Sequence, residues 1–573
     1  MNKKWVVSKK VPEALINKFP EINPVILQLL YNRNIVEQND IDEFLNPEYK
    51  HNLHDPYLFK DMKKATKRIW QAIENKEKIV VHGDYDADGV CSSVVLYDTL
   101  KNLGADVSVF LPHREREGYG MNVVTVQNFI DQGNNLIITT DCGITNHAEV
   151  ELARKNGVDV IITDHHEAPV DLPRANAIIN PNVKGETYPF KHLAGSGVAF
   201  KLASALITES LAKQEYTLPE GFEKWLLDMV AISTVTDIMP LLGENRVFVK
   251  YGLIVLEKTR RPGLKALIET IGNRKGKADT FTIGFQIGPR INAAGRMDHA
   301  ILAFQLLTAE TAEKSAELAE KLQMNNIERQ KITVDYVQEA KIQIGDVGDE
   351  KKLLFAIGKD WPAGIIGLIA GKLADEFYRP TLILTEQDGK ITGSGRSIRE
   401  FNIVEALEKT QIHFERWGGH SQAGGFTLKS VASVEQFQID FEKVVNDELH
   451  GKKLFPFLEV EADIRLKDID WEFYGQLDSF QPFGEGNRNP YFLVRGAEVA
   501  GMQKVGSTGK HLKLMIRDDS GLVRKTIGFG FGDFFDTIEI GEKADIVFEV
   551  GVNEWNGNRE LELKIIDIKV NNE

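Results

Sequence analysis

The feature that most constrains the fold is an alternation of apolar runs, polar or glycine-rich loops and amphipathic helical stretches, which begins at residue 79. Helical stretches such as VCSSVVLYDTLKNLG and HAEVELARKNG end in glycine, which commonly terminates a helix. The apolar runs predict strands at Ile79–His82, Val107–Leu111, Leu136–Thr139, Val158–Ile162 and Ala177–Ile179. Strands that alternate with helices predict an α/β fold with a parallel, doubly wound sheet.

Acidic and imidazole side chains follow three of these strands, in the segments HGDYDADG, TTDCGI and ITDHHE. In an open α/β sheet, ligands bind outside the carboxyl ends of the strands. We therefore expect one crevice to collect the side chains of His82, Asp84, Asp86, Asp88, Asp141, Asp164, His165 and His166.

Crowded aspartates repel one another unless a positive charge shares their site, which favours a divalent metal pair. Asp237, which interrupts a later apolar segment, completes a set of six candidate ligands: His82, Asp86, Asp88, Asp141, His165 and Asp237. Mixed carboxylate and imidazole ligands favour Mn²⁺ or Mg²⁺ over zinc, and Mn²⁺ over Mg²⁺. Two such metals stabilise an in-line displacement at phosphorus, so the cluster predicts phosphoester hydrolysis, with Asp84 supporting the loop.

Single members of this set have simpler interpretations. Taken alone, Asp237 is as typical of a helix cap or a buried partner as of a metal ligand. His165 and His166 point in different directions, so one of them is left to contact phosphate, donate a proton or only form a hydrogen bond. Cys91 and Cys142 are too few for a disulfide framework, and we expect both to be buried.

The rest of the chain indicates several domains. The stretch from Ser315 to Ile344 lacks proline and glycine and predicts a linking helix about 45 Å long. A second α/β pattern follows, and five strand-like segments from Tyr491 onward predict a small oligonucleotide-binding (OB) barrel. We expect an N-terminal extension at 1–55, a catalytic domain at 56–310, the linking helix at 311–347, the second α/β domain at 348–454 and the barrel at 455–573.

Composition excludes several classes of protein. A hydrophobic content of 42% and a charged content of 27% are ordinary for a folded globular protein. We find no apolar run long enough for a membrane helix and expect a cytoplasmic protein. The net charge of −15 disfavours nonspecific binding to nucleic acid but allows a local basic channel.

The order of motifs resembles a known family. HGDYDADG, TTDCG, TDHH, Asp237, GSGRS and GGHSQAGGF resemble the DHH phosphoesterase superfamily with its DHHA1 domain. LPHREREGYGMN, IGPRINAAGRM, WPAGIIGLIAGKLADEFYRP and QPFGEGNRNP are similar to the RecJ family within it. The resemblance implies a metal-dependent exonuclease that degrades single-stranded DNA from its 5′ end to mononucleotides, in DNA repair and recombination.

The resemblance also implies residue roles. It makes the six candidates above the ligands of two metal ions, with Asp141 bridging, and it places His166 beside the scissile phosphate and Asp84 in support of the loop. Candidates to bind phosphate or DNA are Arg114, Tyr119, Arg290, Arg296, Ser394, Arg396 and His420. Loop arginines are otherwise typically only solvated, and Tyr119 is equally typical of packing. The basic runs KTRRPG and GNRKGK, and Phe529, Phe531 and Trp555 in the barrel, are further candidates.

Three alternatives stay open on the sequence. One is a related phosphodiesterase acting on short oligoribonucleotides or cyclic dinucleotides, one is an inactive scaffold of replication or repair, and one is a binding protein without chemistry. The family resemblance further implies a monomer that works with a single-strand-binding protein and a RecQ-type helicase, without a membrane.

Overall fold

The computed structural model describes the chain except for residues 1–2, 214–215, 217, 273–276, 556 and 571–573. The chain divides into two compact units. We call the larger one, His54–Met239 with Tyr251–Phe455, the central unit, and the other, Met1–Leu53 with Pro240–Lys250 and Pro456–Glu573, the terminal unit. Within the described residues, no helix has the length and apolar character needed to cross a membrane.

The first sheet of the central unit confirms the predicted α/β class. Its five strands are all parallel and have the order β3-β2-β4-β5-β6. They are β2 (Lys78–Gly83), β3 (Asp106–Phe110), β4 (Leu136–Thr140), β5 (Asp159–Thr163) and β6 (Ala177–Ile179). Every residue of β4 is buried, which is expected for a strand whose two faces are both covered by helices.

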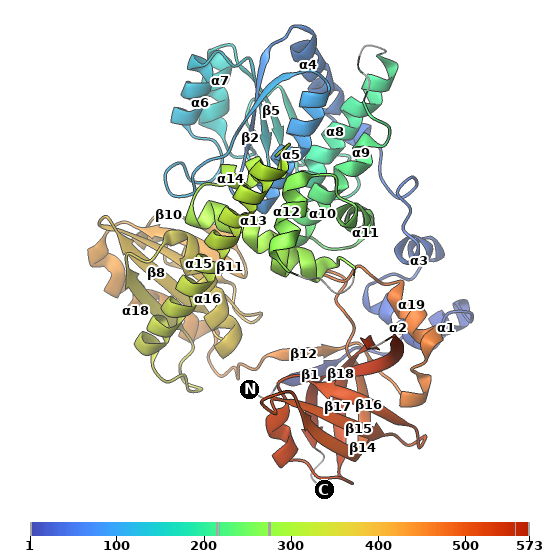
Figure 1. Ribbon diagram of the computed structural model, residues 1–573. Coiled ribbons are helices and arrows are strands. Elements are labelled where there is room, and N and C mark those ends of the chain that lie inside the picture. The colour runs from blue at the N-terminus through green and yellow to red at the C-terminus, as the bar shows by residue number, and fades with distance from the viewer. Residues whose placement is uncertain (1–2, 214–215, 217, 273–276, 556, 571–573) are drawn as a thin grey trace. The chain divides into compact units, whose positions relative to one another are not determined.

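Helices cover both faces of this sheet (Figure 1). On one face lie α6 (Val123–Asp131) and α7 (His147–Lys155), whose apolar side chains join those of the strands in one cluster. On the other lie α4 (Met62–Glu74), α5 (Ala87–Asn102) and α8 (Gly195–Ala212).

A helical region connects this sheet to the next one. It comprises α9 (Phe222–Trp225), α10 (Leu227–Thr236), α11 (Gly243–Glu257), α12 (Pro262–Thr270), the π-helical turn η2 (Thr282–Ile287), α13 (Gly288–Met297) and α14 (Ile301–Leu307). The predicted linking helix is confirmed as α15 (Ala312–Ile344), which begins where the Thr311 side chain accepts a hydrogen bond from Lys314 N. Its 33 residues span about 50 Å.

The second sheet of the central unit is mixed and has the order β10-β11-β9-β8-β7. Only β7 and β8 pair in parallel, and the other neighbours are antiparallel. Its strands are β7 (Leu354–Lys359), β8 (Thr381–Gln387), β9 (Lys390–Arg396), β10 (Phe414–His420) and β11 (Ala423–Leu428), and its helices are α16 (Ala363–Phe377), α17 (Ile403–Lys409) and α18 (Val434–Glu448).

The terminal unit contains the predicted barrel. Its five strands close on themselves because β14 pairs with both β15 and β17. They are β14 (Phe492–Val505), β15 (His511–Arg517), β16 (Val523–Gly528), β17 (Lys543–Trp555) and β18 (Asn558–Val570). The helix α19 (Trp471–Asp478) and the short strand β13 (Ala462–Asp463) precede them.

The N-terminal extension is part of this unit. It contains the short helices α1 (Glu13–Lys18), α2 (Pro24–Asn32) and α3 (Gln38–Leu45) and a strand that we did not predict, β1 (Lys4–Val7). This strand pairs in parallel with β12 (Phe457–Val460). Leu27 and Leu30 of α2 belong to the same apolar cluster as Phe492 and Phe548 of the barrel, so the extension supplies part of the core.

Candidate metal centre

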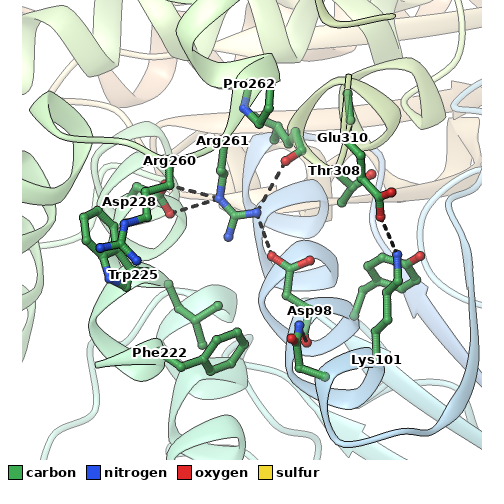
Figure 2. A pocket seen from close by; sticks show the side chains of 15 residues that line it. Asp98, Lys101, Phe222, Trp225, Asp228, Arg260, Arg261, Pro262, Thr308 and Glu310 are labelled. Atoms are coloured by element: carbon green, nitrogen blue, oxygen red, sulfur yellow. Dashed lines mark hydrogen bonds and ion pairs between the residues drawn. The ribbon is translucent and has the colours of Figure 1, made fainter. Parts of the chain in front are cut away.

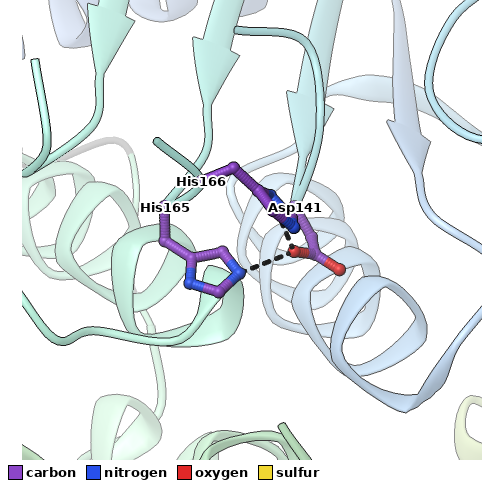
Figure 3. A group of neighbouring side chains, drawn as sticks. All are labelled: Asp141, His165 and His166. Atoms are coloured by element: carbon purple, nitrogen blue, oxygen red, sulfur yellow. Dashed lines mark hydrogen bonds and ion pairs between the residues drawn. The ribbon is translucent and has the colours of Figure 1, made fainter. Parts of the chain in front are cut away.

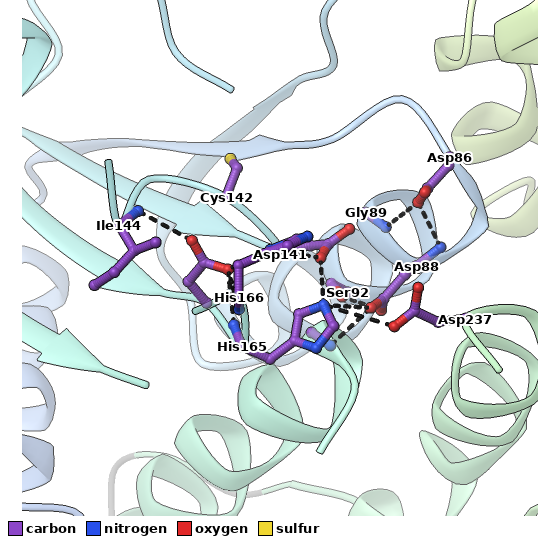
Figure 4. A network of polar contacts seen from close by, with 12 residues as sticks. Asp86, Asp88, Gly89, Ser92, Asp141, Cys142, Ile144, His165, His166 and Asp237 are labelled. Atoms are coloured by element: carbon purple, nitrogen blue, oxygen red, sulfur yellow. Dashed lines mark hydrogen bonds and ion pairs between the residues drawn. The ribbon is translucent and has the colours of Figure 1, made fainter. Parts of the chain in front are cut away.

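The structure brings the predicted acidic loops together. Strands β2, β4 and β5 are neighbours in the parallel sheet, so the loops after them lie at one edge. The loop after β2 carries Asp84 and Asp86, and Asp88 follows in the first turn of α5. The other two loops carry Asp141 and His165. Asp237 reaches the same place as the residue that ends α10 (Figure 4).

Ligand atoms within 4.8 Å of one another form three groups in the described residues. The groups are Asp141 with His165 and His166, Asp88 with His165 and Asp237, and Asp84 with Asp86 and Asp141. His165 Nε2 lies 3.0 Å from Asp141 Oδ1 and 3.6 Å from both Asp88 Oδ2 and Asp237 Oδ2 (Figures 3 and 4). Asp141 and His165 are each shared by two groups, as a site for two neighbouring ions requires.

Close backbone packing fixes these carboxylates. Asp88 accepts hydrogen bonds from the N–H groups of Gly195 (2.7 Å) and Ser196 (2.9 Å) at the start of α8, and from Ser233 Oγ (2.5 Å). Asp141 has the left-handed φ of 61°, and a Cβ at position 195 would lie 2.7 Å from Asp141 Cβ. Glycine is therefore required there for α8 to approach the loop.

The donor set fits a divalent cation. Burial first, and then the charges of neighbouring carboxylates, raises the pKa of Asp84, Asp141 and Asp237 well above the usual range. His82 Nε2, Asp84 Oδ1 and Asp237 Oδ2 are buried with no hydrogen-bond partner among the described residues. A shared cation would relieve the repulsion between the buried carboxylates and would give these unpartnered atoms a partner.

The two adjacent histidines differ in their surroundings. Burial lowers the pKa of His165, so its nitrogen is available as a ligand. Burial also disfavours the charge of His166, but the hydrogen bond from Nδ1 to Asp164 Oδ1 (2.8 Å) and the charges of the nearby carboxylates together outweigh burial and raise the pKa. The Tyr119 hydroxyl lies 3.1 Å from the same Nδ1 and donates to Asp141 O at 3.3 Å, so it contacts the site by its polar end.

Two predicted roles look different in the structure. His82 is in none of the three groups, its Nδ1 faces the Cys142 thiol at 3.7 Å, and burial lowers its pKa to about 4. Asp84 stands among the candidate ligands, whereas the loop is held by Asp86, which caps α5, and by Asn292, which accepts from Ala87 N. The metal role of His82 and the supporting role of Asp84 stay predictions.

Three of the predicted phosphate-binding arginines form a cluster, which comprises Arg114, Arg296 and Arg396. Burial first, and then the neighbouring guanidinium groups, lowers the pKa of Arg296 to about 9, and burial and Arg114 lower that of Arg396. Among the described residues, none of the three forms an ion pair with a carboxylate. A cluster of half-buried cations without ion-pair partners is suited to an anion.

Ser394 and Arg396 of β9 lie close to the helix α16. Arg396 Nη1 donates to Ser394 Oγ at 3.3 Å, and both side chains face α16 at Gly367. A Cβ at Gly367 would lie 3.1 Å from Ser394 Oγ and 3.2 Å from Arg396 Nη2. Gly367 was not among the predicted site residues. The spacing of Gly364, Gly367 and Gly371 by three and four residues indicates one glycine-lined side of a helix, which would have pointed to it.

The remaining candidates lie apart from this cluster. The segment GPRINAAGRM is helix α13, and its Arg290 donates to Gln323 Oε1 (2.7 Å). His420 lies on the edge strand β10 and is in register, through Ala423, with Arg396 two strands away, roughly 10 Å. The charge of Arg329 in α15 acts on both Arg290 and Arg296. Arg329 was not among the predicted site residues because α15 was expected only to link two domains.

The basic runs have mixed outcomes. Arg261 of KTRRPG pairs with Asp98 and Asp228 beside a cavity of about 570 Å³, and Arg260 covers the Trp225 ring at 3.9 Å (Figure 2). Most of GNRKGK lies outside the described residues.

In the barrel, the Phe529 side chain is exposed, and Phe531 packs on the core. The side chain of Trp555 lies outside the described residues. Cys91 and Cys142 are buried, as expected.

Comparisons with known proteins agree with this architecture. Family models match residues 78–234 (DHH family, N-terminal domain), 350–447 (DHHA1 domain) and 460–567 (RecJ OB domain). The Thermus thermophilus structure described as RecJ in complex with Mn²⁺ has a TM-score of 0.83 and 28% identity, covering 99% of this chain and 79% of that one. The same protein in complex with Mg²⁺ has a TM-score of 0.77 and 26% identity, with 99% and 78% covered.

A curated relative gives the clearest assignment. The single-stranded-DNA-specific exonuclease RecJ of Bacillus subtilis (strain 168) is 38% identical over 551 residues, which cover 96% of this chain and 68% of the relative. At that identity and coverage, with the metal groups and the arginine cluster in place, the chain belongs to the RecJ family.

Proposed function

We propose that the protein is a metal-dependent exonuclease that degrades single-stranded DNA from its 5′ end and releases mononucleotides, in DNA repair and recombination. One observation carries the proposal within this family: the metal-binding groups adjoin a cluster of unneutralised arginines. The charge of Asp86 acts on Arg296, which links the two parts of the site.

The proposed cofactor is Mn²⁺, or Mg²⁺, with two ions in each site. When bound, the ions polarise the scissile phosphate and provide a nucleophilic water. Asp86, Asp88, Asp141, His165 and Asp237 would hold them, and His82 is the sixth predicted ligand. The hydrogen bonds that Asp88 accepts from the start of α8 keep its carboxylate in place without neutralising it.

His166 acts on the substrate in this proposal. Its Nδ1 is held by Asp164, so the ring presents Nε2, and its side chain is 37% exposed. The Asp164 carboxylate raises the pKa of His166 and so favours the protonated imidazole, whose Nε2–H would donate to a phosphate oxygen.

The arginine cluster provides the end specificity. Arg114, Arg296 and Arg396, with Ser394, would bind the 5′-terminal phosphate and so position the first phosphodiester bond beside the metal-binding residues. Arg290 and His420 lie along the further path of the strand, and Tyr119 orients His166. The arginine cluster adjoins the metal-binding groups, so only one nucleotide would fit between the bound 5′ phosphate and the cleaved bond, and mononucleotides would be released.

The other functions considered above are less well supported. A phosphodiesterase for short oligoribonucleotides or cyclic dinucleotides leaves the RecJ OB domain at residues 460–567 without a role. An inactive scaffold has no use for unpartnered buried carboxylates held within 4.8 Å of each other.

We also propose a cytoplasmic monomer that works with a single-strand-binding protein and a RecQ-type helicase, because an exonuclease for single strands needs a duplex to be opened. Sedimentation and pull-down with each purified partner test this part.

Digestion of end-labelled oligonucleotides tests the function. After chelation and addition of Mn²⁺ or Mg²⁺, a 5′-labelled single strand of DNA should release labelled mononucleotide at once, while a 3′-labelled strand should shorten progressively. Blunt duplex DNA and RNA of the same sequence are the controls. Rapid digestion of blunt duplex, or release from the 3′ end first, would contradict the proposal.

A further inference from the structure

An aromatic pair lies exposed at the start of the helix that carries Arg296. Phe281 and Phe285 are 57% and 71% exposed, and their rings stack with centroids 4.8 Å apart and planes at 22°. Phe285 lies in the π-helical turn η2, and Thr282, whose N–H is capped by the Asp279 side chain, starts that turn. Rings that are stacked and still largely exposed offer a free aromatic face.

The helix formed by η2 and α13 runs directly past the metal site. A Cβ at Gly288 would lie 2.3 Å from Thr236 Cγ2, next to Asp237, and Asn292 Oδ1 accepts from Ala87 N in the metal loop. A Cβ at Gly295 would lie 2.4 Å from the Tyr85 carbonyl oxygen. Each successive turn of α13 therefore contacts the metal-binding loops, and η2 continues beyond them.

The aromatic pair and Arg296 lie on one continuous helix. A Cβ at Gly284 of η2 would lie 3.6 Å from Val235 Cγ1 and one at Gly288 of α13 would lie 2.3 Å from Thr236 Cγ2, so the helix keeps one side towards α10 and Asp237 through the π-helical turn. Eleven residues separate Phe285 from Arg296, a distance of about 16 Å along the axis. A strand anchored at Arg296 that follows this side passes the metal groups and then reaches the aromatic pair.

We propose that Phe281 and Phe285 form a stacking platform for a base of the substrate strand, on the 3′ side of the scissile bond. The inference rests on the proposed function and adds a binding site to it. A single strand has free base faces, which stack on aromatic side chains, while a duplex keeps its bases paired and stacked internally.

Charge near the platform favours nucleic acid over an apolar protein partner. Arg290 follows Phe285 by five residues, and Arg329 lies near enough for the two charges to act on each other. Within the described part of the chain, neither arginine forms an ion pair with a carboxylate, and burial lowers the pKa of both. A base would stack on the rings, and the guanidinium groups of the two arginines would bind the adjoining phosphates.

Substitution of the outer ring tests the platform. Phe285→Leu keeps an apolar side chain of similar size but removes the aromatic face, and we expect KM for a 5′-phosphorylated single strand to rise about tenfold with kcat within twofold. Leu211→Ala, which truncates a side chain 80% exposed on α8, is the control and should change neither constant. An unchanged KM for Phe285→Leu would overturn the platform.

A set of strands with one abasic nucleotide at successive positions locates the contact. For the unaltered protein, KM should rise at one position beyond the first phosphodiester bond, and for Phe285→Leu that rise should disappear. The same positional profile in both proteins would overturn the platform while leaving the exonuclease function intact. Failure of the unaltered protein to digest any single strand would instead overturn the proposed function and, with it, the platform.

Discussion

Arg261 Nε lies 3.2 Å from the Asp228 carboxylate, at the end of α10 that is opposite to Asp237. Its Nη1 lies 2.6 Å from Asp98 Oδ2, near the end of α5 that is opposite to Asp86 (Figure 2). The metal-binding residues lie at the start of α5 and at the end of α10. The Arg261 guanidinium joins the two helices at their other ends and so helps to fix the position of Asp86 and Asp88 relative to Asp237.

Arg261→Lys should therefore weaken metal binding from a distance. Lysine keeps the charge but has no planar fork to join two carboxylates, and loss of a supporting contact typically costs 10- to 100-fold in metal affinity. We expect Mn²⁺ affinity, measured by titration calorimetry, to fall about tenfold. Arg154→Lys, at an exposed arginine that pairs with Glu151, is the matched control. Equal Mn²⁺ affinity in both variants would exclude this role for Arg261.

Asp141→Asn should change activity and stability in opposite directions. The amide removes one charge from the centre of the cluster, so kcat should fall by about a hundredfold or more. The same change relieves repulsion between buried carboxylates and should raise the Tm of the metal-free protein. Asparagine also tolerates the φ of 61°, whereas alanine would add backbone strain to the measurement. A lower Tm for metal-free Asp141→Asn would show that the carboxylates do not oppose folding.

Removal of metal should destabilise the protein more at pH 8 than at pH 6. The pKa values of Asp84, Asp141 and Asp237 are raised in the folded protein, so the folded state binds protons more tightly than the unfolded chain. That contribution favours folding in acid and is lost as pH rises from about 4 through the raised values. Scanning calorimetry with Mn²⁺ and with chelator at each pH measures the difference in Tm, and an equal difference at both values would contradict the expectation.

Gly367→Ala should weaken recognition of the terminal phosphate. The added methyl group meets Ser394 Oγ at 3.1 Å and Arg396 Nη2 at 3.2 Å and narrows the space between them. We expect KM for a 5′-phosphorylated strand to rise more than KM for a 5′-hydroxyl strand. Gly371→Ala is one turn further along α16, where the nearest atom is Arg396 Cγ at 4.0 Å, and should leave both constants unchanged. Equal effects of the two substitutions would place the phosphate elsewhere.

The strand-end residues could be predicted because their signals are local. An apolar run followed by acidic residues places Asp86, Asp141 and His165 at strand ends, and parallel pairing brings those ends to one edge. The contact between Asp88 and Ser233 joins positions 145 residues apart, and no local pattern announces it. The same reason hides the pairing of β1 with β12.

The two glycines of α13 have a role that helix propensity does not indicate. Glycine disfavours helix, yet GPRINAAGRM contains two and is helical. In the structure, the helix needs them because Gly288 lies against Thr236 and Gly295 against the Tyr85 carbonyl, with no room for a side chain. The sequence shows that a position holds glycine, but it does not show whether a turn or a closely packed neighbour requires the glycine.

The composition of the terminal unit has a consequence for synthesis of the protein. Leu27 and Leu30 share their apolar cluster with Phe492 and Phe548, which the ribosome adds more than 400 residues later, after about 20 to 100 s at 5–20 residues per second. The intervening His54–Met239 and Tyr251–Phe455 form the other unit, and none of their described residues belongs to this cluster. The segment with Leu27 and Leu30 therefore waits with its apolar side chains uncovered until the barrel strands are made, and the terminal unit is exposed to aggregation for as long as synthesis of the central unit takes.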